Sequence, residues 1–145
     1  MSRLSVLGYA GLIPFITLPL LYLYPFYLSA DQTLELYSFY SALILGFMAG
    51  VLWPVLHSNA VKPLKNQRLA LVAVTFPVLS IFTLLLASEY FLPAQACLFV
   101  LLRLAEYRSG INRQYQTQYG ALRNHLTVVV CISHLLLYYL LTAAG

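Results

Sequence analysis

The chain alternates long apolar runs with short segments that carry most of its charges. Runs of this kind predict helices, and five of them cover residues 4–28, 36–57, 69–87, 91–107 and 122–142. Each is close to the roughly 20 residues that a helix needs to cross a hydrocarbon core about 30 Å thick. The fourth approaches this length only if Arg103 and Glu106 lie inside the helix. The pattern therefore predicts an all-α, polytopic membrane protein, a single domain built as a five-transmembrane-helix bundle.

Composition excludes a soluble globular domain. Of the 145 residues, 61% are hydrophobic and 8% are charged, whereas soluble domains carry about 25% charged residues. So few charges cannot cover the surface of a water-soluble fold. We therefore expect the lipid bilayer to surround most of the protein.

The charged residues also predict how the chain is threaded. In a five-span arrangement all eight Lys and Arg residues fall on one side of the membrane, and three of the four acids fall on the other. The basic set is Arg3, Lys62, Lys65, Arg68, Arg103, Arg108, Arg113 and Arg123, and the opposing acids are Asp31, Glu35 and Glu89. Because basic loops stay on the cytoplasmic side, the N-terminus is predicted to lie inside and the C-terminus outside. Topology thus explains the basic residues, and no nucleic-acid binding is expected.

Small residues in the second run predict a helix-packing face. Ser38, Ala42, Gly46 and Gly50 recur every four residues, so they share one side of a helix. Small residues let membrane helices approach closely. The face is expected to contact another helix, either of the same chain or of a second copy.

Two charges interrupt the fourth run. Arg103 and Glu106 are three residues apart and therefore neighbours on one helix face. A lone charge at the membrane centre costs roughly 2.5–3.5 kcal/mol on insertion scales, and pairing or reaching toward the headgroups lowers that cost. The pair is either a charged node that lines an inner cavity or an interfacial ion pair that anchors the helix end. Arg123, at the start of the fifth run, is a further candidate partner for Glu106.

The fifth run carries a polar stripe. Residues spaced three or four apart place it on one face of the helix: Arg123, Thr127, Cys131, His134, Tyr138 and Thr142. One interpretation is hydrogen bonding between helices. The other is a proton or solute path, because histidine titrates near neutral pH.

No motif predicts a catalytic or metal centre. His57 and His125 lie near the inner boundary on different helices, and such a pair could ligate a haem iron, but nothing in the sequence specifies that geometry. The sequence contains no H-E-x-x-H zinc motif, no Gly-rich phosphate loop and no Ser-His-Asp order. We therefore predict no enzymatic activity, no metal and no cofactor.

Several stretches resemble a known family. The segment LGYAGLIPF, from Leu7 to Phe15, is similar to the opening of the transmembrane protein 69 family, small integral membrane proteins catalogued as a domain of unknown function. The segments YSA at 40–42 and GFMAGVLW at 46–53 resemble its second signature, and Arg123 with Leu126 and Thr127 resembles its third. The resemblance follows nearly the whole chain in order, and it implies a membrane protein with no established activity.

The resemblance implies bacterial or mitochondrial membranes. The sequence begins almost directly with its first predicted span, without an Arg- and Ser-rich leader. We therefore expect the bacterial inner membrane rather than the mitochondrial inner membrane.

Two functions remain open from the sequence. The first is a non-enzymatic structural, assembly or accessory partner of a membrane complex, which would bind another membrane protein or a second copy of itself. The alternative is a small transporter or channel, with Arg103, Glu106, Arg123 and His134 lining the route.

Overall fold

The computed structural model describes residues 3–52, 63–114 and 117–144, which are helical apart from short connections and contain no strand. The α-helices in these ranges are α1 (Arg3–Ala10), α2 (Ile13–Leu23), α3 (Ala30–Ala49), α4 (Pro63–Leu86), α5 (Phe91–Ser109) and α6 (Thr117–Ala144). Short 3-10 turns adjoin them: η1 (Gly50–Leu52), η3 (Ser88–Tyr90) and η4 (Ile111–Gln114). The all-α prediction is confirmed for this part of the chain.

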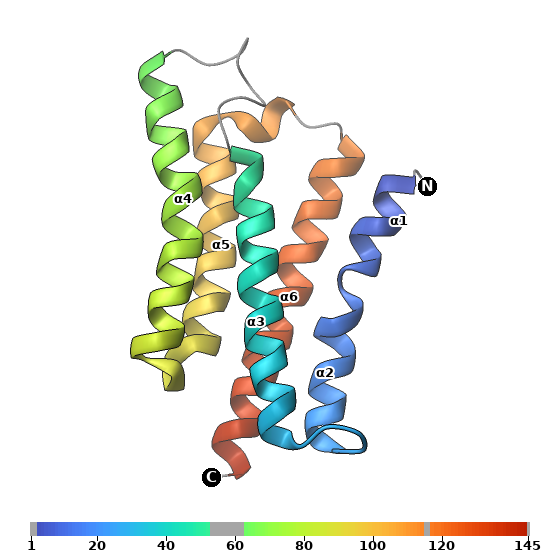
Figure 1. Ribbon diagram of the computed structural model, residues 1–145. Coiled ribbons are helices and arrows are strands. Elements are labelled where there is room, and N and C mark those ends of the chain that lie inside the picture. Colours follow the sequence, from blue (N-terminus) through green and yellow to red (C-terminus); the bar gives the residue numbers. More distant parts are fainter. Residues whose placement is uncertain (1–2, 53–62, 115–116, 145) are drawn as a thin grey trace.

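The helices form an elongated bundle. Helices α1 and α2 follow one another end to end, so the chain makes five rods that run side by side in alternating directions (Figure 1). Helix α6 packs against α5 and the α1–α2 rod, and α3 packs against α2, α4 and α5. The two termini therefore lie at opposite ends of the bundle (Figure 1).

Among the residues that the structure describes, three helical stretches are long and apolar enough to cross a membrane: Ser5–Leu23, Gln67–Leu86 and Thr117–Ala143. They correspond to the first, third and fifth predicted spans. The second and fourth predicted spans correspond to α3 and α5, which are 20 and 19 residues long. These two helices lie alongside the others but carry charged residues, namely Asp31 and Glu35 in α3 and Arg103, Glu106 and Arg108 in α5.

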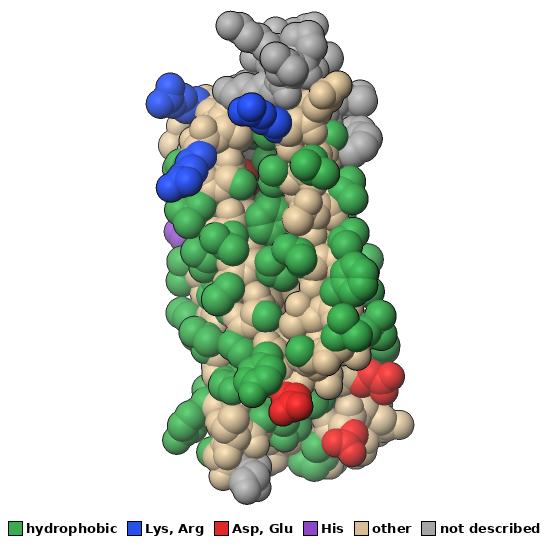
Figure 2. Space-filling model, turned by 90° about the vertical axis from the view of Figure 1, so that its left-hand side faces the viewer, with side chains coloured by type: hydrophobic (Ala, Val, Ile, Leu, Met, Phe, Trp, Pro, Cys, Tyr) green, Lys and Arg blue, Asp and Glu red, His purple; other side chains and the backbone are tan. Residues whose placement is uncertain are grey.

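The surface is divided by charge along its long axis. Figure 2 shows Lys and Arg side chains at one end, Asp and Glu side chains at the other, and hydrophobic side chains over the face between them. Many large apolar side chains on this surface are exposed, among them Leu71, Leu85 and Phe47. An apolar girdle between two polar ends is what a bilayer requires of a helical bundle.

The first predicted span is divided where its prolines act. Pro14 has no N–H to donate to the Ala10 carbonyl, and the chain tightens just before it through a bond from Leu12 N to Tyr9 O at 3.0 Å. The neighbouring carbonyl of Gly11 accepts the Tyr40 hydroxyl of α3 at 2.7 Å. The rod ends at Leu23 rather than residue 28, shortly before Pro25. Its kink thus contributes a polar contact to the bundle.

Helix α3 begins at Ala30, six residues before the predicted second span. A capping box starts it there: Ser29 Oγ accepts the Gln32 amide at 3.1 Å, and Gln32 Oε1 accepts the Ser29 amide at 3.1 Å. Asp31 in the first turn adds a favourable interaction with the helix dipole. The capping hydrogen bonds therefore set the start of the helix, whereas the prediction placed it where the apolar run begins.

The small-residue face of α3 is only partly used for packing. Ser38 and Ala42 are buried, and a Cβ placed on Gly46 would lie 3.6 Å from Pro77 Cβ of α4, an ordinary contact distance. Gly50 is exposed, and no described atom would lie within 4 Å of a Cβ placed on it. Gly50 therefore has no such neighbour among the described residues, and its contact with another helix or with a second copy stays a prediction. The close glycine approach occurs instead at Gly8, where a Cβ would lie 2.7 Å from Leu122 Cδ2 of α6.

Candidate functional site

A buried charged cluster joins the end of α5 to the beginning of α6. We call Arg103, Glu106 and Arg123 the charged node. The two carboxylate oxygens of Glu106 are divided between the arginines: Oε2 pairs with Arg103 Nη1 and Oε1 pairs with Arg123 Nη2. Glu106 is 0% exposed, Arg103 is 5% exposed and Arg123 is 3% exposed. Both guanidinium groups are thus enclosed by the protein.

Arg103 has a second anchor on α6. Asn124 Oδ1 accepts hydrogen bonds from Arg103 Nε at 3.0 Å and from Nη2 at 2.7 Å. The Tyr107 hydroxyl accepts a further bond from Nη2 at 3.1 Å, and the guanidinium carbon lies 4.5 Å from the centroid of the Tyr107 ring. A guanidinium can satisfy acceptors in several directions because its donors form a planar fork. Arg103 therefore holds α5 and α6 together through charge, hydrogen bonds and cation–π contact.

Arg123 extends the node to a third helix. Its Nη2 donates to the backbone carbonyl of Met48 in α3 at 3.3 Å, and its Nη1 donates to the Tyr119 hydroxyl at 3.3 Å. The node thus cross-links α3, α5 and α6 near one end of the bundle. It contains two arginines and one carboxylate, so a single acid on α5 pairs with one arginine of its own helix and one of α6.

His134 is held at the centre of an aromatic cluster. Its Nδ1 lies 2.7 Å from the Val130 carbonyl, and its Nε2 lies 2.6 Å from Ser41 Oγ of α3. A carbonyl can only accept, so Nδ1 carries the proton and Nε2 accepts the Ser41 hydroxyl. The rings of Phe15, Tyr37 and Phe99 have centroids 5.0–5.6 Å from the imidazole. Both nitrogens of this 0% exposed ring are therefore occupied by protein groups.

Ser133, the neighbour of His134, donates a hydrogen bond to a backbone carbonyl that a proline leaves without its helical donor. Pro19 lacks the N–H that would bond to the Phe15 carbonyl four residues earlier. Ser133 Oγ donates to that carbonyl at 2.6 Å. Because this uses its only proton, the Tyr37 hydroxyl donates to Ser133 Oγ at 2.7 Å. The relay Tyr37–Ser133–Phe15 joins α3, α6 and α2.

Replacing Ser133 with alanine is expected to lower the free energy of unfolding by about 1–3 kcal/mol, because the Phe15 carbonyl and the Tyr37 hydroxyl both lose their partner. Thermal unfolding in detergent, followed by circular dichroism, measures the loss. Ser38→Ala is the matched control, since the Ser38 hydroxyl donates only to the Leu34 carbonyl of its own helix. In a Pro19→Ala background the helix regains its own donor, so the cost of Ser133→Ala should shrink. An equal cost in both backgrounds would contradict the relay.

The predicted site residues thus occupy two separate places. The structure brings Arg103, Glu106 and Arg123 together and places His134 in a different cluster farther along α6. Within the predicted stripe, Cys131 Sγ contacts the Ala96 carbonyl at 3.4 Å, whereas Thr127 and Thr142 bond to carbonyls of their own helix. His57 lies outside the described residues. No group of three or more metal-ligating side chains occurs in the described part of the chain.

The sequence did not predict four residues that hydrogen-bond in the two clusters: Asn124, Ser41, Ser133 and Tyr37. Tyr37 and Ser41 are four apart on α3 and meet the adjacent pair Ser133 and His134 on α6. That spacing was visible in the sequence, but the pairing of the two helices was not. Asn124 follows Arg123 directly, yet its acceptor role depends on the register of α6 against α5.

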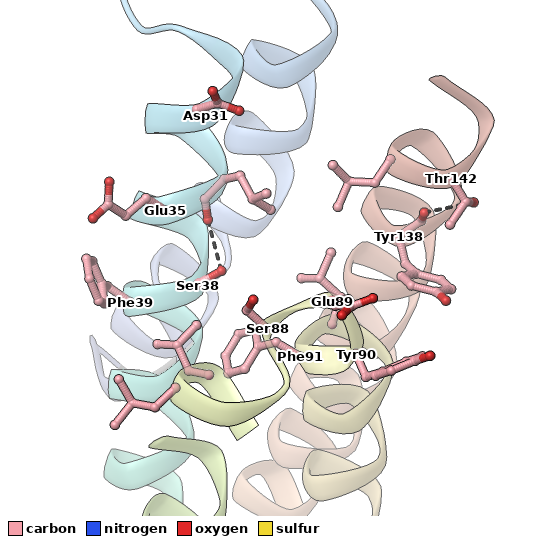
Figure 3. Close-up of a pocket in the computed structure, with 15 residues that line it drawn as sticks. Asp31, Glu35, Ser38, Phe39, Ser88, Glu89, Tyr90, Phe91, Tyr138 and Thr142 are labelled. Carbon is pink, nitrogen blue, oxygen red and sulfur yellow. Dashed lines mark hydrogen bonds between the residues drawn. The ribbon is translucent and has the colours of Figure 1, made fainter. Parts of the chain in front are cut away.

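A pocket of about 790 Å³ lies at the opposite end of the bundle from the charged node. We call it the outer notch, after the side of the membrane on which the sequence predicts this end to lie. Helices α3 and α6 form two of its walls, and the turn from α4 into α5 lies between them (Figure 3). Its lining combines apolar and aromatic side chains with Asp31, Glu35 and Glu89. These are three of the four acidic residues of the chain.

A family model matches residues 2–139, described as a protein of unknown function (DUF3429). The chain belongs to the DUF3429 family. No curated protein and no solved structure matches the chain. The match includes the residues of both the charged node and the His134 cluster, but the family description gives neither of them an activity.

Proposed function

We propose that this DUF3429 protein is a non-enzymatic, multi-pass membrane protein that serves as a structural or accessory partner of a membrane complex. The main observation in its support is that the buried polar groups bind one helix to another. The charged node and the His134 cluster bind helices α2, α3, α5 and α6 to one another. Placing such groups in a bilayer costs free energy, and here their contacts hold the helices in one arrangement.

The proposal includes five spans with the N-terminus inside and the C-terminus outside, in the bacterial inner membrane, and kinship with the transmembrane protein 69 family. Support for the threading comes from the termini at opposite ends and from the segregation of basic and acidic side chains (Figures 1 and 2). An odd number of passes and a basic cytoplasmic end are both consistent with the positive-inside rule.

The alternative function, a small transporter or channel, needs four side chains to face one hydrated route. Arg103, Glu106, Arg123 and His134 instead hydrogen-bond to neighbouring protein groups. Arg123 and His134 are also eleven residues apart on one helix, about 16 Å along its axis. This occupancy supports the structural role over transport.

Impermeant thiol labelling tests the threading. In a background lacking Cys97 and Cys131, Ser88→Cys in η3 should react from outside intact cells, and Arg113→Cys in η4 should react only after lysis. Reaction of both from the same side would contradict the five-span arrangement.

Purification in mild detergent with light crosslinking tests the partnership. We expect a companion membrane protein, or a second copy, at fixed stoichiometry in native mass spectrometry. A solitary monomer across several mild detergents would contradict the proposed function while leaving the threading untouched.

A further inference from the structure

The outer notch has the form of a ligand site. The turn formed by η3 stops between the longer ends of α3 and α6, which leaves an open space of about 790 Å³ (Figure 3). Sites for small molecules span about 300–1,000 Å³ and combine apolar walls with a few polar groups. Here Phe91 and Leu92 are buried in the floor, while Phe39 and Tyr90 are exposed at the sides.

The charge of the notch is uncompensated. Asp31, Glu35 and Glu89 are exposed, and none of them forms an ion pair with a residue that the structure describes. The surrounding segments 24–43, 79–102 and 124–145 contain no Lys or Arg, so the chain itself supplies no cation here. A parallel second copy would not supply one either, because its basic residues lie at the other end (Figure 2). Charge complementarity therefore favours a cationic group from another molecule.

A buried amide, that of Gln95, lies beneath the floor of the notch. Gln95 follows Phe91 and Leu92 by four and three residues, so it shares their face of α5. It is 0% exposed, its Oε1 accepts the Ser80 hydroxyl at 2.8 Å, and its Nε2 has no partner among the described residues. Helical side chains lean toward the N-terminus of their helix, which for α5 is the end at the notch. An unpaired buried donor costs free energy, but Gln95 does not line the notch, so the argument for a ligand depends on the volume, lining and charge of the notch itself.

We propose that the outer notch binds the headgroup of an amine-bearing phospholipid, with the ammonium group at the carboxylates and the ester and acyl portion against the apolar lining. The ammonium supplies the missing cation, and the notch is also lined by Tyr90 and Tyr138, whose aromatic rings attract cations. A lipid fits better than a free amine because the lining continues into the exposed apolar surface at Leu85 and Phe39. The site depends on the bilayer setting in the proposed function but not on any protein partner.

Native mass spectrometry tests this site with lipids of stated composition. The protein is reconstituted in nanodiscs of phosphatidylethanolamine and phosphatidylglycerol in equal amounts, extracted in mild detergent, and the retained lipids are counted. We expect phosphatidylethanolamine to be retained about 1.5-fold to fivefold more than phosphatidylglycerol, the range expected for exposed charge pairs. Equal retention of the two lipids would overturn the proposal.

Two variants separate a site from general electrostatics. Glu35→Gln with Glu89→Gln removes two exposed carboxylates and should bring the retention ratio close to one. Ser88→Trp fills the notch while keeping every charge, and it should lower the ratio to the same extent. Arg113→Gln, an exposed change at the other end, is the control and should retain the wild-type ratio. Retention that survives Ser88→Trp in a protein with the wild-type circular dichroism spectrum would also overturn the proposal.

A competition experiment distinguishes a lipid from a free amine. Dodecylamine, an amphiphilic amine without a phosphate ester, should compete only weakly, and complete displacement at equimolar lipid would contradict a lipid-specific site.

Discussion

Replacing Glu106 with glutamine is expected to lower the free energy of unfolding by about 3–5 kcal/mol, because it leaves buried charges without their partner. Glutamine keeps the size of the side chain but removes the only carboxylate of the charged node. Arg103 and Arg123, which are 5% and 3% exposed, would then face each other as two uncompensated cations. Equilibrium unfolding in mixed micelles, followed by circular dichroism, measures the change.

The control for this prediction uses the same substitution at an exposed acid. Glu35→Gln removes a carboxylate from the surface of α3 and should change stability by less than about 0.5 kcal/mol. The double variant Glu106→Gln with Arg123→Gln returns the node to a single excess positive charge, so it should recover part of the loss. If Glu106→Gln unfolds like Glu35→Gln, the node does not hold the helices together.

The value of the node lies in specificity as much as in stability. A buried ion pair often contributes little net free energy compared with a well-packed apolar cluster. It does, however, penalise every arrangement in which a charge loses its partner. Because Glu106 joins α5 to α6 and Arg123 also reaches the Met48 carbonyl of α3, sliding any of these helices would break a charged contact. The node therefore fixes the register of three helices.

Hydropathy predicted the helices well, because a bilayer imposes length and apolarity directly on the sequence. The boundaries were harder. The Ser29–Gln32 capping box moves the start of α3 outward, and Pro14 and Pro25 divide and end the first rod. These effects come from local hydrogen bonding, which competes with hydropathy at helix ends. Whether all five rods span the membrane remains a prediction.

The candidate site was only partly visible in the sequence. The contact between Arg103 and Glu106 follows from a spacing of three on one helix, and Arg123 was foreseeable from its place at the same end of the bundle. The partners of His134 were not, because helical spacing gives the face of a residue but not the neighbour that meets it. The same applies to packing: the motif at Gly46 and Gly50 predicted close contact, yet a Cβ on Gly8 would lie 2.7 Å from Leu122 Cδ2 of α6, nearer than the 3.6 Å from a Cβ on Gly46 to Pro77 Cβ of α4.

Removing the imidazole of His134 is the second large effect that we expect. His134→Ala should lower the free energy of unfolding by about 2–4 kcal/mol, because it opens a cavity among Phe15, Tyr37 and Phe99 and breaks the bond from Ser41. Thermal unfolding in detergent checks the loss. His125→Ala is the control: His125 is exposed and bonds only at the edge of the bundle, to the Tyr9 hydroxyl at 2.9 Å, so its loss should cost less than about 1 kcal/mol.

A paired substitution distinguishes packing from chemistry at this position. His134→Phe together with Ser41→Ala restores an aromatic ring and removes both hydrogen-bonding partners at once. Replacing both partners by apolar groups of similar shape is often nearly neutral, and the Val130 carbonyl keeps its ordinary helical donor. We therefore expect the double variant to lie within about 1 kcal/mol of the wild type, with His134→Phe alone less stable because Ser41 is left buried and unpaired. If the double variant is as unstable as His134→Ala, then neither the shape of the ring nor the bond to Ser41 explains the contribution of the imidazole to stability. That result would contradict a purely structural role for the polar stripe of α6.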